Sequence, residues 1–87
     1  MSKIEIYTTA QCPYCVSAKN FIKQKGWDYQ EIRVDTDQAQ REAMLTRSAG
    51  RRSVPQIFIA GVHVGGYDDL VAADRAGRLR ELMEAAA

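Results

Sequence analysis

The chain has 87 residues, 46% of them apolar and 26% charged, with a formal net charge of +1 at pH 7. This length allows one small domain with one core, so residues 1–87 are expected to form a single domain. The balanced charge argues against nucleic acid as a partner, because such binding depends on neutralising many phosphates. The sequence has neither the ~20 apolar residues that cross a bilayer nor an N-terminal stretch resembling a secretory signal. It therefore predicts a cytoplasmic protein without a membrane partner.

The first half of the chain predicts a strand followed by a helix. Residues 4–7 alternate apolar and polar side chains, which is typical of a strand. Pro13 suits the first position of a helix, where a backbone N–H is not needed. The helical spacing of the apolar residues that follow places Tyr14 and Ala18 on the inward face, and Gly26 is suited to end the helix.

Turn residues and hydrophobic periodicity divide the rest of the chain. They predict a strand over 28–35, a helix from a cap at Thr36 or Asp37 to about Ser48, a hairpin of strands over 56–59 and 62–64, and helical segments from 67 with a break at Gly77. In this order the first two strands should be parallel, joined by a right-handed crossover, with the hairpin antiparallel to them. We therefore expect an α/β fold with a four-stranded mixed sheet flanked by helices.

The motif Cys12-Pro13-Tyr14-Cys15 carries the most specific chemistry. Two thiols at this spacing, after a strand and at the start of a helix, are typical of a thioredoxin-like redox site. Cys12 occupies the N-cap position, where free N–H groups and the helix dipole stabilise a thiolate. Its pKa is therefore expected to be lowered, which makes it the attacking sulfur. Cys15, inside the first turn, is expected to be shielded and to act second, as the resolving thiol.

Other uses of the two thiols fit less well. A zinc site needs four ligands, whereas the chain has two cysteines and a single histidine, His63, in a predicted strand. A cysteine hydrolase needs a histidine base; one histidine satisfies the count, but the second thiol and the small size argue against this class. A thioredoxin-type dithiol reductase is closer in both fold and reaction.

Four segments together resemble the glutaredoxins, in particular the small bacterial dithiol class, over nearly the whole chain. They are Ile4-Glu5-Ile6-Tyr7-Thr8, the Cys12–Cys15 motif, Ser53-Val54-Pro55-Gln56-Ile57-Phe58-Ile59 and Gly65-Gly66-Tyr67-Asp68-Asp69-Leu70. The resemblance implies a thioredoxin-like fold and a glutathione-dependent oxidoreductase that reduces protein disulfides and glutathione mixed disulfides. It implies glutathione as reducing co-substrate, no metal, disulfide-bonded or glutathionylated proteins as transient partners, and a monomer.

The resemblance also implies a set of glutathione-binding residues. A cis Val54–Pro55 bond should face Cys12 and leave the backbone before the proline free to pair with the cysteinyl part of glutathione, as a short added strand does. The γ-glutamyl end should lie at the N-terminus of the following helix. Thr9 stands where the family often has a lysine, so an arginine is expected to bind the glycyl carboxylate. The implied set is Tyr14, Ser53, Val54, Pro55, Gly66, Tyr67, Asp68 and Arg41, with Arg47, Arg51 or Arg52 as alternatives to Arg41.

Two further functions remain open within the resemblance. Some glutaredoxins carry an iron–sulfur cluster, shared by two chains through the first cysteine and two glutathiones, although those that do usually lack the proline found here at position 13. The other function is that of an electron donor to one reductase, itself reduced by thioredoxin reductase rather than by glutathione.

Overall fold

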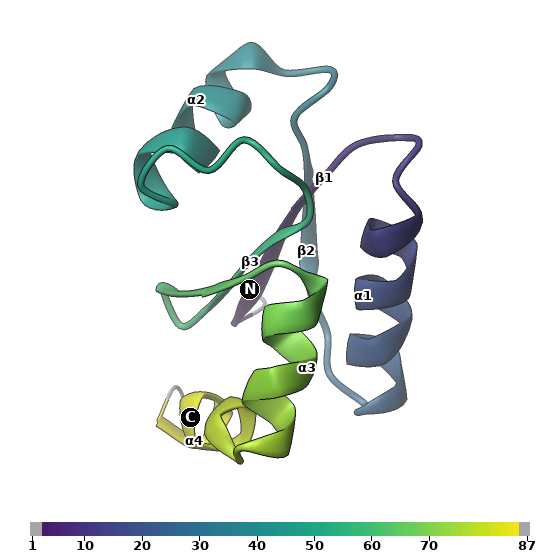
Figure 1. Cartoon of the computed structure of the whole chain (residues 1–87), viewed down its shortest axis with the longest axis vertical. Coiled ribbons are helices and arrows are strands. Elements are labelled where there is room, and N and C mark those ends of the chain that lie inside the picture. The colour runs from purple at the N-terminus through teal and green to yellow at the C-terminus, as the bar shows by residue number, and fades with distance from the viewer. Residues whose placement is uncertain (1–2, 86–87) are drawn as a thin grey trace.

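The structure, a computed structural model, describes residues 3–85; residues 1, 2, 86 and 87 of the predicted domain lie outside this range. Along the chain its elements are β1 (Ile4–Thr8), α1 (Pro13–Gln24), β2 (Gln30–Arg33), α2 (Gln38–Arg47), β3 (Gln56–Ile59), β4 (Val62–Gly65), α3 (Tyr67–Arg75) and α4 (Arg78–Ala85) (Figure 1). The predicted order of strands and helices is thus confirmed.

The strands form one mixed sheet in the order β2-β1-β3-β4. β1 pairs in parallel with β2 across the α1 crossover, while β3 runs antiparallel to both β1 and β4. The predicted parallel pair of first strands and the antiparallel direction of β3 are therefore confirmed, whereas β4, antiparallel to β3, runs in the same direction as β1. The fold is thioredoxin-like. β1 and β3 are the inner strands, and the loops that follow β1 and precede β3 meet at one end of the sheet.

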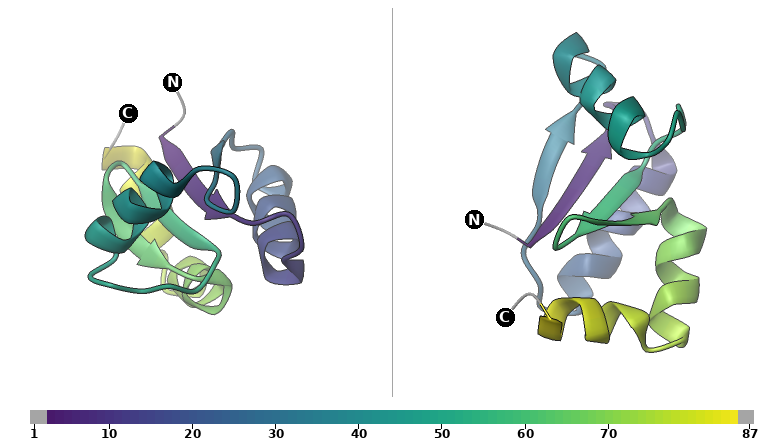
Figure 2. Two further views of the ribbon diagram at one scale, coloured as in Figure 1. Left: turned by 90° about the horizontal axis from the view of Figure 1, so that it is seen from above. Right: turned by 90° about the vertical axis from the view of Figure 1, so that its left-hand side faces the viewer.

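Helices cover both faces of the sheet, with α2 on one face and α1 and α3 on the other (Figure 2). Successive residues of a strand point to opposite faces, so each inner strand contributes to two clusters. The cluster on the α1 and α3 side contains Ile4, Ile6, Ala18, Ile22, Ile57, Ile59, Leu70 and Leu79. The cluster on the α2 side contains Tyr7, Val34, Met44 and Phe58. Among residues 3–85, no helix combines the length and apolarity that a bilayer crossing requires.

Two local predictions need correction. The second strand was expected over 28–35 but covers Gln30–Arg33, because β2 is an edge strand and only these residues pair with β1. Tyr14 was expected on the inward face of α1 but is 63% exposed. The buried residues of α1 are instead Cys15, Ala18 and Ile22. Successive residues of a helix are about 100° apart, so Tyr14, which precedes Cys15, points to the side of this buried stripe.

Candidate active site

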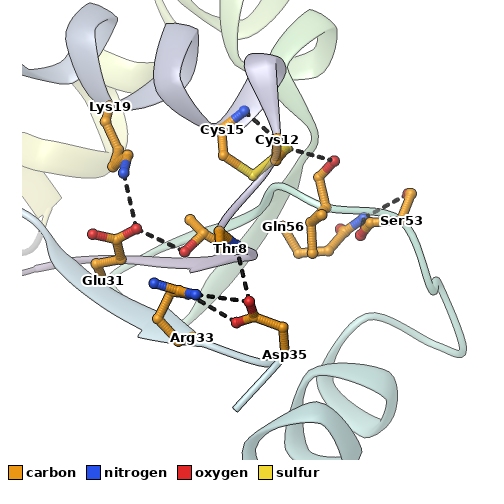
Figure 3. The surroundings of a disulfide bond; sticks show 11 residues. Thr8, Cys12, Cys15, Lys19, Glu31, Arg33, Asp35, Ser53 and Gln56 are labelled. Atoms are coloured by element: carbon orange, nitrogen blue, oxygen red, sulfur yellow. Dashed lines mark hydrogen bonds and ion pairs between the residues drawn. A yellow bond between two sulfur atoms is a disulfide. The ribbon is translucent and has the colours of Figure 1, made fainter. Parts of the chain in front are cut away.

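The two cysteines lie at the junction of the β1–α1 loop and α1, where they form a disulfide (Figure 3). Cys12 is the N-cap of α1, with extended backbone, and the backbone N–H of Cys15 donates to its Sγ over 3.1 Å. Cys12 is half-buried, whereas Cys15 is 1% exposed. The predicted cap position of Cys12 and the shielding of Cys15 are confirmed. The N–H contact and the helix dipole favour negative charge on the Cys12 sulfur.

The segment that precedes β3 lies next to the disulfide. The Val54–Pro55 peptide bond is cis, as the resemblance implied. The carbonyl oxygen of Val54 lies 3.7 Å from Cys12 Sγ. The backbone at position 54 is therefore next to the sulfur that is most accessible to a substrate.

A pocket of about 170 Å³ opens beside this pair of segments, lined by Tyr14, Arg51, Ser53, Val54, Pro55, Gly66, Tyr67, Asp68 and Asp69. The residues come from the start of α1, the α2–β3 loop and the β4–α3 corner, which are distant in sequence. The rings of Tyr14 and Tyr67 lie with their centroids 6.2 Å apart. The structure thus brings together all the residues implied for glutathione except Arg41.

The arginines near the pocket differ in what they contact. Arg41 is exposed on α2 and is not among the lining residues, whereas Arg51 is. Arg47 is hydrogen-bonded to side chains of β1: its guanidinium donates to Glu5 over 3.0 and 3.1 Å and to the Tyr7 hydroxyl over 2.9 Å. Arg51 precedes the cis bond by three positions in the same loop, and this proximity was the sequence signal that favours it over Arg41.

The β4–α3 corner depends on two glycines and a carboxylate. Gly65 has φ +120°, a conformation that L side chains rarely adopt, and a Cβ there would overlap the side chain of Asp69. Asp69 accepts the backbone N–H of Gly66 over 3.0 Å and lies 3.5 Å from Arg51 Nη1. It is a lining residue that the sequence prediction did not include. Asp68, in the first turn of α3, is exposed at the pocket.

Charged residues behind the motif contact the β1–α1 loop at Ala10 and the middle of α1 at Lys19. The Asp35 carboxylate accepts from Arg33 and also from the backbone N–H of Ala10 over 3.0 Å, and the Arg33 bond holds the pKa of Asp35 well below its usual range. Glu31 accepts from Lys19 over 2.9 Å and from the buried Thr8 hydroxyl over 2.7 Å. Figure 3 shows Arg33 and Asp35 below the disulfide, and Lys19 and Glu31 to the left of it.

The hydrogen bonds to Glu31 predict that part of the free energy of unfolding is lost at acid pH. The hydrogen bond from Lys19, followed by that from Thr8, lowers the pKa of Glu31 against the opposing effect of burial. A carboxylate whose pKa is lowered by folding stabilises the protein at pH values above its pKa in the unfolded chain, about 4.3. This stabilisation is lost as the pH falls through the pKa of the carboxylate in the folded protein. We expect Glu31→Gln to reduce the free energy of unfolding by about 0.5–1 kcal/mol at neutral pH, and by less at about pH 3.

Urea unfolding of both proteins at the two pH values measures this effect. Glu42→Gln, at an exposed carboxylate of α2, is the matched control and should change stability little at either pH. If the difference in free energy of unfolding between Glu31→Gln and wild type stayed constant as the pH fell, the stabilisation would not come from the Glu31 carboxylate.

Comparison with known proteins gives a consistent result. Residues 4–64 match the family model described as Glutaredoxin. Glutaredoxin 3 of Escherichia coli is 49% identical over 84 residues, covering 97% of this chain and 100% of that protein. A glutaredoxin of Pseudomonas aeruginosa is 51% identical over 85 residues, covering 98% and 100%.

Solved structures agree with these relatives. A buckwheat glutaredoxin–glutathione complex superposes with a TM-score of 0.85 at 31% identity, covering 98% of this chain and 79% of that one. Glutaredoxin from Brucella melitensis superposes with a TM-score of 0.79 at 44% identity, covering 95% and 89%. Among residues 3–85, no three histidine, cysteine or acidic side chains are grouped so as to hold a metal ion.

Proposed function

Because the chain belongs to the glutaredoxin family of thiol–disulfide oxidoreductases, we propose that it uses glutathione to reduce protein disulfides and glutathione mixed disulfides. One observation carries the proposal. The half-buried sulfur of Cys12 adjoins a pocket that has an open backbone segment on one side and a helix N-terminus on another. Glutathione has the groups that such a pocket recognises, namely a peptide backbone, an α-amino acid end and a terminal carboxylate.

Each part of the tripeptide has a partner in this arrangement. The cysteinyl backbone pairs with the backbone of Val54, which places the glutathione sulfur at Cys12. The γ-glutamyl carboxylate lies against the N–H groups at the start of α3, and its ammonium lies against Asp68. The glycyl carboxylate binds the guanidinium of Arg51, which lies 3.5 Å from Asp69 in the structure, with Tyr14 alongside. The similar buckwheat protein is a glutaredoxin described in complex with glutathione, which supports glutathione as the ligand.

With a glutathionylated protein, the Cys12 thiolate attacks the glutathione sulfur, and the protein leaves as a thiolate that takes up a proton. Cys12 is then bonded to glutathione. A second glutathione, as its thiolate, attacks the glutathione sulfur of this mixed disulfide. The products are glutathione disulfide and the Cys12 thiolate. Each turnover therefore consumes one free glutathione, because the other half of the glutathione disulfide comes from the substrate.

With a disulfide-bonded protein, Cys12 forms a mixed disulfide with one substrate sulfur and releases the other. Cys15 then gives up its proton and attacks Cys12, which frees the reduced substrate. The Cys12–Cys15 disulfide of the structure is the oxidised product of this step. Two glutathiones return it to the dithiol and leave as glutathione disulfide.

The proposal is tested by supplying electrons in two ways to the same protein. With glutathione, glutathione reductase and NADPH, we expect rapid reduction of a small glutathione mixed disulfide. With thioredoxin, thioredoxin reductase and NADPH in place of the glutathione system, we expect much slower turnover. Fast turnover with the thioredoxin system alone would refute glutathione dependence and favour a dedicated electron donor.

Replacing the proposed carboxylate-binding cation should weaken substrate binding rather than slow the chemistry. We expect Arg51→Gln to raise KM for a glutathione mixed disulfide about three- to tenfold with kcat little changed, because one charge-assisted contact is lost in a solvent-exposed place. Arg41→Gln is the matched control, with the same change of charge on α2. If Arg41→Gln raised KM and Arg51→Gln did not, the cation would be Arg41, as first predicted.

A further inference from the structure

Gln56, the first residue of β3, has a fully buried side chain that makes three hydrogen bonds. Its Nε2 donates to the carbonyl oxygen of Ser53 over 3.0 Å and to the Ser53 hydroxyl over 3.2 Å. Its Oε1 lies 2.7 Å from Nε2 of His63. Figure 3 shows the contacts between Gln56 and Ser53, close to the disulfide. The amide thus joins β4 to the segment that precedes the cis bond.

The directions of these bonds are fixed by chemistry. A backbone carbonyl only accepts, so the nitrogen of the Gln56 amide must face Ser53, and its oxygen must therefore face the histidine. An amide oxygen also only accepts, so Nε2 of His63 must carry a hydrogen. The result is a directed relay in which His63 donates to Gln56 and Gln56 donates twice to Ser53.

The imidazole is itself held in place. It stacks on the ring of Phe58 with centroids 4.8 Å apart and planes 28° apart, and the Arg47 guanidinium lies 4.1 Å from the same phenyl centroid. Burial lowers the pKa of His63, as do the charges of Arg51 and Arg47, against the opposite effect of Asp69. The ring is therefore neutral at neutral pH, with one hydrogen, and the contact to Gln56 places that hydrogen on Nε2.

We propose that His63 is a positioning residue for glutathione, acting through Gln56 on the Ser53–Val54 segment that lines the pocket. His63 is not a lining residue of that pocket and does not take part in the chemistry. It fixes the backbone that the cysteinyl part of glutathione is proposed to pair with. This inference rests on the proposed function, since it assigns a role in binding the same tripeptide.

Two substitutions separate the ring stacking from the hydrogen bond. His63→Phe keeps an aromatic ring against Phe58 but removes the donor, whereas His63→Gln loses the ring and retains an N–H donor at similar reach. In the glutathione-coupled assay we expect His63→Phe to raise KM for a glutathione mixed disulfide about three- to tenfold with kcat within about twofold, as for one lost hydrogen bond that acts on binding alone. His63→Gln should restore most of the wild-type KM.

Leu82→Ala, on α4, is the control that shows whether a loss of stability alone raises KM. Leu82 is half-buried and packs against the core on the α1 and α3 side, so this variant weakens the fold without contacting the relay. It should lower the melting temperature and leave KM unchanged. The inference is overturned if His63→Phe has the wild-type KM, if His63→Gln fails to restore it, or if Leu82→Ala raises KM equally.

The position of the hydrogen is checked without glutathione. In a ¹⁵N spectrum of the wild-type protein at neutral pH, we expect the His63 signals to show a protonated Nε2 and an unprotonated Nδ1. The opposite tautomer would overturn the relay, whatever the enzyme's substrate. If the wild-type protein showed this tautomer yet had no glutathione-dependent turnover, the proposed function would fail while the relay stood.

Discussion

Replacing the first cysteine of the motif, Cys12→Ser, is expected to abolish the reduction of both glutathione mixed disulfides and protein disulfides. A serine hydroxyl is not ionised near neutral pH and forms no disulfide, so neither cycle can begin. The expected fall in kcat/KM is on the order of 10³-fold or more, the scale seen when catalytic nucleophiles are removed. The measurement is the glutathione-coupled assay with wild type and variant at equal concentration.

The variant should nevertheless fold. Cys12 is the N-cap of α1 and its side chain accepts the backbone N–H of Cys15, and serine is among the residues that cap helices best. Far-ultraviolet circular dichroism and the melting temperature of the reduced proteins test this directly. A well-folded Cys12→Ser that retained more than a small fraction of wild-type turnover would show that the attacking sulfur lies elsewhere.

The second large effect concerns Cys15→Ser, which should separate the two reactions. Reduction of a glutathione mixed disulfide needs only the Cys12 thiolate and a second glutathione, so its rate should stay within a few-fold of wild type. Reduction of a protein disulfide by the dithiol route needs a second sulfur inside the protein. That activity should be lost, because serine cannot attack the mixed disulfide between Cys12 and the substrate.

Trapping of the intermediate provides the measurement. When it is incubated with a disulfide-bonded protein in the absence of glutathione, Cys15→Ser should accumulate as a mixed disulfide with that protein, which a thiol reductant releases. The wild-type protein should not accumulate in this form. Loss of both activities in Cys15→Ser, with the fold intact, would contradict the division of roles between the two cysteines. Because Cys15 is buried, the fold is checked in the same way as for Cys12→Ser.

The sequence was sufficient to predict the parts of the site that depend on local pattern. A strand, a Cys-Pro-Tyr-Cys motif and an amphipathic helix are consecutive in the chain, and the N-cap position of Cys12 follows from helix geometry and from Pro13. The resemblance to glutaredoxins added the cis bond before Pro55 and most of the pocket. These residues belong to short continuous motifs, so their place depends little on the rest of the sequence.

The parts that depend on tertiary packing could not be predicted in the same way. Residue type does not distinguish Arg41, Arg47 and Arg51, and the proximity of Arg51 to the cis bond is a weak signal. The fold shows that Arg51 lines the pocket while Arg47 is bonded to the sheet. Tyr14 fits a helical apolar pattern, yet it points to the side of the buried stripe, which consists of Cys15, Ala18 and Ile22. The link between His63 and Gln56 crosses two strands and leaves no periodic signal.

The unequal burial of the two sulfurs also matters for work with the purified protein. Once the disulfide is reduced, only the sulfur at position 12 is open to solvent, while that of Cys15 is enclosed by the core. An alkylating reagent in limiting amount will therefore modify the chain at a single thiol. A fluorophore or spin label can be attached at the mouth of the pocket without removing a cysteine by mutation.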